Sequence, residues 1–131
     1  MMKQAPNAVS LPIFNKNIAD AALDMGYDEI AKNSIVQIKK LAPPLAMQNK
    51  MSGEIICHWL AEIGAKSIIK NKHSLTDVII SSIKSIEQII GEEKTREGFA
   101  IEQKYKKKDN NIKIAYDDFM KKYWHNARNK K

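Results

Sequence analysis

The sequence predicts an all-α protein, a compact bundle of about five to seven short helices with an extended N-terminal arm and a basic C-terminal helix. Helix-favouring Ala, Ile, Lys and Glu dominate the composition, whereas Val and aromatic residues are few. Only five Gly and four Pro interrupt 131 residues. Apolar residues recur at three- and four-residue spacing in several segments, which is the helical period. The length fits a single domain with a buried core.

Residues 1–15 are expected to form the arm, because they contain Pro6 and Pro12 among scattered apolar residues. The single helical domain is predicted to span residues 16–131. Its first helix is short, begins at an N-cap on Asn17 and ends at Gly26.

A second helix is predicted from Asp28 to the Pro43-Pro44 pair, because proline disfavours helix in the residue before it and lacks an N–H donor. A connector over residues 43–53 then precedes a helix over residues 54–63. After Gly64 the apolar pattern changes phase, so either this helix kinks or two helices meet there. We expect a kink.

The clearest amphipathic pattern follows a loop at residues 71–73. Ser74 to Asp77 resembles a capping box, and the apolar residues up to Ile90 fall within roughly 140° of one helix face. Gly91 is the expected C-cap. A charge-rich, exposed helix with an interruption near Gly98 is predicted next. The last helix is expected to run from Ile112 to about Arg128.

Residues 104–131 contain the entire net charge of the chain. They hold ten Lys and Arg against three Asp, a balance of +7, and residues 1–103 are neutral, with 12 basic and 12 acidic residues. The same segment holds five of the nine aromatic residues. Cations interleaved with aromatic rings are typical of a surface that meets a polyanion.

Within the last helix, Ile112, Tyr116, Phe119 and Tyr123 recur on one face and are expected to pack on the bundle. Trp124 lies about 100° away, on a face with basic residues. Two interpretations of Trp124 stay open. It either stacks on a base or fills a partner's pocket, or it shields the rim of the bundle under a cation–π contact from Arg128.

The leading functional hypothesis is a small basic protein, without enzymatic activity, that binds nucleic acid through backbone phosphates, alone or as a subunit of a nucleoprotein complex. Arginine occurs only at positions 96 and 128, so bidentate reading of base edges is poorly supported and binding is expected to be sequence-independent. The sequence does not separate DNA from RNA. The candidate binding residues are Lys104, Lys106, Lys107, Lys108, Lys113, Lys121, Trp124, Arg128, Lys130 and Lys131.

Two alternatives belong to other classes. In the first alternative, the protein is a small adaptor or inhibitor, of the kind encoded by phages and mobile elements. Its Trp124 and Tyr123 would anchor it on an acidic surface of a protein partner. In the second alternative, the protein is a homo-oligomer in which the exposed ends of the isoleucine stripes meet across a two-fold axis.

Catalytic and metal signatures are missing from the sequence. His58, His73 and His125 are scattered, so no metal site is expected, and His58 is predicted to be an exposed residue paired with carboxylates. The adjacent Asp117 and Asp118 diverge on a helix and are expected to pair with lysines four residues on. No cofactor motif occurs. We therefore expect neither an enzyme nor a bound cofactor.

A cytoplasmic protein without membrane contact is expected. Cys57 is the single cysteine, the first residues lack the apolar segment of a signal peptide, and no apolar run approaches membrane-spanning length.

One stretch, Lys39 to Met51, combines a Lys/Leu-Pro segment with a following Asn and an apolar helix. It resembles the small all-helical subunit of type III CRISPR effector complexes over about 25 residues. Lys50 stands where that family has Gly, and its C-terminal Trp-basic motif is matched only by Trp124-His125. The resemblance implies a subunit that lines a backbone-binding groove in an RNA-guided complex.

Overall fold

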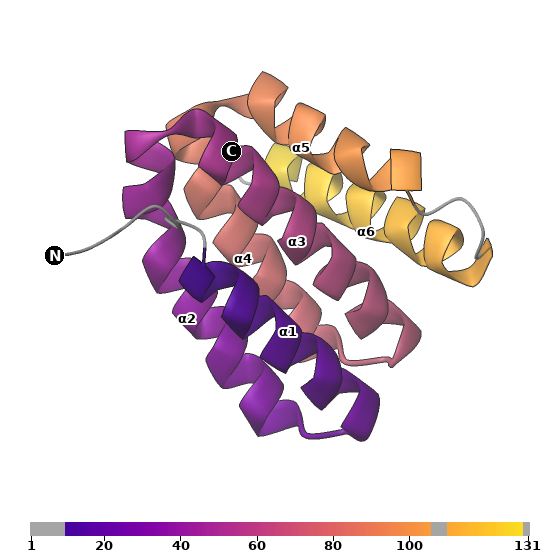
Figure 1. Cartoon of the computed structure of the whole chain (residues 1–131). Helices are drawn as coiled ribbons and strands as arrows, with labels where there is room; N and C mark the ends of the chain where they lie inside the picture. Colours follow the sequence, from indigo (N-terminus) through magenta and orange to yellow (C-terminus); the bar gives the residue numbers. More distant parts are fainter. Residues whose placement is uncertain (1–9, 106–109, 130–131) are drawn as a thin grey trace, which may run out of the picture.

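A computed structural model describes the backbone of residues 10–105 and 110–129 and the side chains of residues 12–100 and 114–125. Across these residues the regular structure is entirely helical, which confirms the predicted all-α bundle (Figure 1). The six helices are α1 Ser10–Met25, α2 Asp28–Gln48, α3 Lys50–Ile69, α4 His73–Ile90, α5 Glu92–Tyr105 and α6 Asn110–Asn129.

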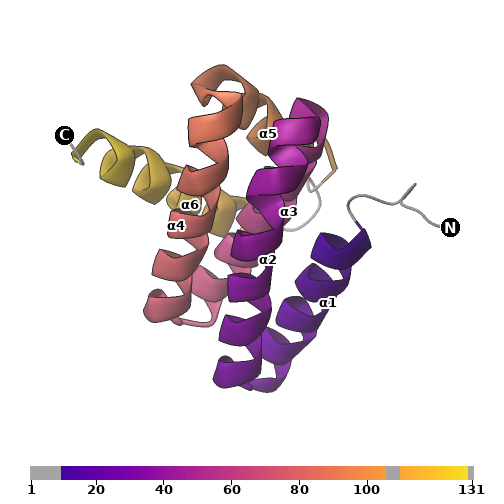
Figure 2. The same cartoon turned by 90° about the vertical axis from the view of Figure 1, so that its left-hand side faces the viewer.

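The central element is α3, which packs against each of the other five helices. Figure 2 shows α1 and α6 on opposite sides of the bundle, with α3 and α4 between them. A helix with partners on several sides needs apolar residues on several faces. This explains the change of phase after Gly64: α3 continues through that residue as one helix, and two separate helices are excluded.

The start of α1 corrects the predicted boundary of the arm. Residues 10–15 are helical, and Pro12 is buried in the first turn of α1. Proline is tolerated there because the first N–H groups of a helix have no intrahelical acceptor. Residues 1–9 of the predicted arm lie outside the described residues.

The Pro43-Pro44 pair does not end α2, which extends to Gln48, so the predicted connector over residues 43–53 is wrong. Ala42 and Ala46, on either side of the prolines, are almost completely buried. The helical hydrogen bonds also resume after the prolines, since the N–H of Asn49 donates to the carbonyl of Leu45 at 3.0 Å. Tertiary packing of this segment therefore outweighs the two lost donors.

Asn49 alone separates α2 from α3 and serves both helices. Its side-chain Oδ1 accepts a hydrogen bond from the backbone N–H of Met51 at 2.9 Å, so Asn49 is the N-cap of α3. We expect Asn49→Ala to lower the free energy of unfolding by about 1 kcal/mol and Asn49→Asp to preserve it. Urea denaturation of both variants measures this. Equal stability of the alanine variant and the wild type would contradict the capping role.

The predicted apolar face of α4 is confirmed, and its predicted capping box is wrong. The helix begins at His73, and its N-cap residue, Lys72, makes no side-chain capping bond. Thr76 instead donates to the carbonyl of Lys72 at 3.2 Å and shares a buried hydrogen bond with the hydroxyl of Ser67. Gly91 is the C-cap, as predicted, with φ of 92°.

The charge-rich helix α5 continues through Gly98, where the sequence indicated an interruption. A Cβ at this position would lie 2.6 Å from the carbonyl oxygen of Glu54 in α3. The missing side chain therefore lets the backbones of α5 and α3 approach closely.

Candidate nucleic-acid interface on α5 and α6

The buried face of α6 is the aromatic stripe. Tyr116, Phe119 and Tyr123 are at most 2% exposed, which confirms that these rings pack on the bundle. The hydroxyl of Tyr116 donates to the carbonyl of Phe99 in α5 at 2.7 Å, and the hydroxyl of Tyr123 donates to the Glu87 carboxylate in α4. These two bonds fix the rotation of α6 about its axis, and so decide which of its side chains face outward.

The outward face of α6 carries two exposed lysines, Lys121 and Lys122. They border an open depression together with Met120, Trp124 and His125. Of the predicted binding residues, Lys121 and Trp124 have described side chains, and both line this depression. The side chains of the others lie outside the described residues: Lys104, Lys106, Lys107, Lys108, Lys113, Arg128, Lys130 and Lys131.

Trp124 is half-buried at the junction of α5 and α6. Its ring meets Phe99 edge to face at a centroid distance of 5.8 Å and Tyr123 at 4.8 Å. Such edge-to-face contacts are the preferred geometry of aromatic pairs. The packing fits the interpretation in which Trp124 shields the rim, and it also holds the ring rigidly at the border of the depression.

The cation above Trp124 is a residue that sequence analysis did not select. The guanidinium carbon of Arg96 in α5 lies 4.1 Å from the centroid of the Trp124 ring. The expected partner was Arg128, one turn away on the same helix, whose side chain is outside the described part of the chain. Helical spacing identifies only partners on the same helix, so a contact between residues 28 positions apart gave no signal.

Arg96 is oriented by a second contact. Its Nε and Nη2 donate to Oε2 of Glu92, one turn earlier in α5, at 3.0 and 2.8 Å. The side chain of Arg96 remains 52% exposed. The guanidinium plane is thus positioned from one edge by a carboxylate and from one face by an indole ring, while about half of the whole Arg96 side chain is exposed.

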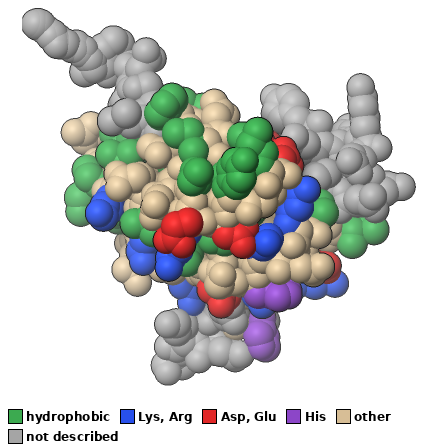
Figure 3. Space-filling view, turned by 90° about the horizontal axis from the view of Figure 1, so that it is seen from below, with side chains coloured by type: hydrophobic (Ala, Val, Ile, Leu, Met, Phe, Trp, Pro, Cys, Tyr) green, Lys and Arg blue, Asp and Glu red, His purple; other side chains and the backbone are tan. Residues whose placement is uncertain are grey.

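Several lysines in residues 1–103, the neutral part of the chain, have carboxylate partners. Lys66 in α3 forms ion pairs with Asp20 at 2.8 Å and Asp24 at 2.9 Å in α1. Partial burial lowers the pKa of Lys66, but the hydrogen bonds to both aspartates outweigh it, so the pKa is raised. Seen from below, the surface carries acidic and basic side chains side by side (Figure 3).

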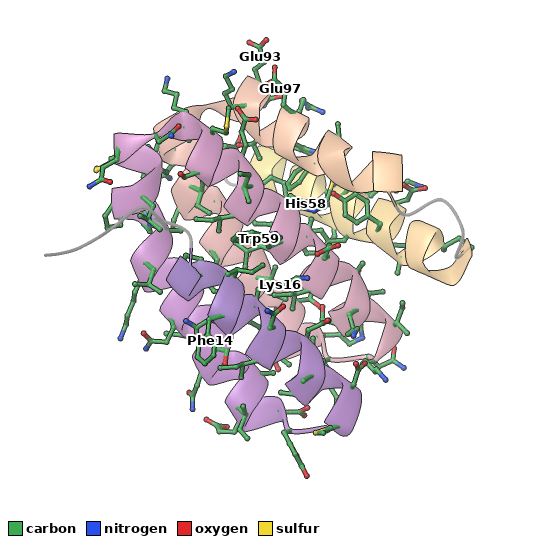
Figure 4. The ribbon with its side chains drawn as sticks, in the orientation of Figure 1. Phe14, Lys16, His58, Trp59, Glu93 and Glu97 are labelled. Atoms are coloured by element: carbon green, nitrogen blue, oxygen red, sulfur yellow. The ribbon has the colours of Figure 1, made fainter. Side chains whose placement is uncertain are left out.

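The polar face of α3 carries His58 and, one turn later, Glu62. Figure 4 shows His58 and Trp59 on α3 and Lys16 on the neighbouring helix α1. His58 is half-buried, so the prediction of an exposed histidine is wrong. Lys16 pairs with Glu62, one turn after His58 in α3, at 2.8 Å. Within the described residues, no group of three or more His, Cys, Asp or Glu side chains is arranged to hold a metal ion.

Cys57 lies in the core and is completely buried. Burial, reinforced by the nearby Glu87 and Glu54 carboxylates, raises the pKa of its thiol. A protonated, inaccessible thiol is a poor nucleophile. Cys57 is therefore a packing residue.

No helix among the described residues has both the length and the apolar character needed to cross a membrane. Comparison of the chain with protein-family models, curated proteins and solved structures gives no match.

Proposed function

We propose that this protein binds nucleic acid through backbone phosphates, without enzymatic activity and without reading sequence, alone or as part of a nucleoprotein assembly. One observation carries the proposal: the whole net charge of +7 lies in the last 28 residues. Burial of the aromatic stripe supports it, because it directs Lys121 and Lys122 outward.

The chemistry of the cations favours phosphates over base edges. Lysine is a flexible point charge suited to phosphate contacts, whereas bidentate base reading needs the planar fork of arginine. The chain has two arginines. One of them, Arg96, already uses its Nε and Nη2 donors on Glu92.

Fluorescence anisotropy with labelled 20-nucleotide DNA and RNA, single-stranded and duplex, at several salt concentrations tests the proposal. The logarithm of the association constant is expected to fall linearly with the logarithm of the salt concentration, because phosphate contacts release counterions. The double variant Lys121→Gln/Lys122→Gln is expected to reduce the magnitude of this slope by about 1 for each lysine removed.

The matched control is Lys32→Gln/Lys40→Gln, which removes the same charge from exposed positions on α2. It is expected to leave the slope nearly unchanged. No binding at low salt, or equal effects of the two double variants, would contradict the proposal. Salt-tolerant binding to a protein partner that is lost in Trp124→Ala would support the adaptor hypothesis instead.

A further inference from the structure

The contact between Arg96 and Trp124 places a guanidinium plane on an indole ring, next to the exposed Lys121 and Lys122. Trp124 occupies one side of the guanidinium, at 4.1 Å from its ring centroid, and the Arg96 side chain is still half exposed. Trp124 also borders the depression that Lys121 and Lys122 line. A planar cation and two point charges therefore share one region of the surface, contributed by α5 and α6.

The surface is preorganised. Glu92 fixes the guanidinium edge, and Trp124 is itself supported edge to face by Phe99 and Tyr123. A side chain that is already ordered loses less conformational entropy when a ligand stacks on it. The neighbouring acidic residue Glu97 is paired with Lys94 at 3.4 Å, which reduces its repulsion of an anionic ligand.

We infer that the ligand of this surface is single-stranded nucleic acid: an unpaired base stacks on the open face of the Arg96 guanidinium, and Lys121 and Lys122 bind the flanking phosphates. The inference rests on the proposed function and specifies its ligand. Guanidinium planes and aromatic rings are the groups on which unpaired bases stack in proteins. A base in a duplex is stacked on its neighbours on both faces, so only its edges are accessible.

Arg96→Lys is the decisive variant, because lysine keeps the positive charge and loses the plane. We expect the wild type to bind a 20-nucleotide single strand about tenfold more tightly than a duplex of the same length, at equal salt. Arg96→Lys is expected to weaken single-strand binding by about tenfold and to leave duplex binding unchanged. The reverse exchange two residues earlier, Lys94→Arg, is the control and is expected to preserve the preference.

Two further measurements make the result independent of how Arg96→Lys folds. A single strand with abasic sites retains its phosphates but has no bases, and the wild type is expected to bind it about as weakly as the duplex. In a Trp59→Phe background Trp124 is the only tryptophan. Its fluorescence is expected to change on binding of the single strand and to stay constant with the duplex.

Equal affinity of the wild type for the intact single strand, the abasic strand and the duplex would overturn the inference while leaving phosphate binding in place. Equal losses of single-strand and duplex binding in Arg96→Lys, with native circular dichroism, would assign Arg96 a structural role and also overturn it. Failure of the proposed function is a different result, in which neither form binds at low salt.

Discussion

Gly64→Ala is expected to destabilise the wild-type protein and to stabilise a Phe119→Ala variant. In the structure, a Cβ at position 64 would overlap the Phe119 ring, whose Cζ lies 2.7 Å from that point. Overpacking of this kind costs about 1–3 kcal/mol, and the better helix propensity of alanine returns about 1 kcal/mol. A net loss of up to about 2 kcal/mol follows in the wild type.

Phe119 is completely buried, so Phe119→Ala alone is expected to lower the free energy of unfolding by about 3–5 kcal/mol. In that background the overlap no longer exists, and Gly64→Ala is expected to add up to about 1 kcal/mol through helix propensity. A double-mutant cycle in urea measures the reversal of sign. Additive effects of the two substitutions would show that α6 does not pack on α3 at this glycine.

Gly53→Ala provides a comparison at another buried helical glycine of α3. The nearest atom to its Cβ would be Cγ2 of Ile90, at 2.8 Å, and the next nearest would be Cβ of Ala46, at 3.1 Å. A small shift relieves that one contact, whereas a Cβ at position 64 would lie within 3.0 Å of three atoms of the tightly packed Phe119 ring. A comparison of Gly64→Ala with Gly53→Ala therefore separates the steric cost at position 64 from the general effect of placing alanine in a helix.

The parts of the fold that the sequence predicted are those in which one helix face meets one partner surface. The apolar face of α4 and the aromatic stripe of α6 were both identified from spacing alone, and both are buried. The spacing of apolar residues did not predict α3 as one continuous helix, because a central helix carries apolar residues on several faces. Local rules also failed at Pro43-Pro44, because burial of the flanking alanines stabilises the helix more than the prolines disfavour it.

The sequence predicted the chemical character of the candidate interface, but it did not predict how its residues are arranged in space. Charge counting located the basic segment, and the helical period separated Trp124 from the buried rings. Arg96 was not identified, since it belongs to α5 and reaches Trp124 only through the packing of α5 against α6. The close approach of α5 to the backbone of α3 at Gly98 is likewise a contact between two helices. A contact between two helices requires their relative positions, which no pattern within one helix contains.

The stability of the protein is expected to fall steeply at alkaline pH, because two buried groups must release protons that they bind more tightly in the folded state. Burial and the hydrogen bond to Glu87 raise the pKa of Tyr123, and burial raises the pKa of Cys57. Unfolded thiols and phenols titrate near about 8.5 and 10. Both contributions are therefore fully present below these values and are lost as pH rises toward the folded-state pKa values, at up to about 1.4 kcal/mol per pH unit for each group.

Tyr123→Phe separates the two groups. At pH 7 it removes a hydrogen bond to a carboxylate and is expected to cost about 2 kcal/mol. Above pH 10 the wild type loses the contribution of Tyr123, whereas the variant lacks the hydroxyl and has no such contribution. The difference in the free energy of unfolding between the two proteins is therefore expected to shrink with each further pH unit and to vanish about 1.5 units above pH 10. Tyr27→Phe is the matched control, because Tyr27 is 55% exposed, and its stability is expected to follow the wild type at every pH. Urea denaturation from pH 7 to 11.5 measures all three proteins. A constant gap between Tyr123→Phe and the wild type across this range would show that the Tyr123 hydroxyl gains nothing from its buried position against α4.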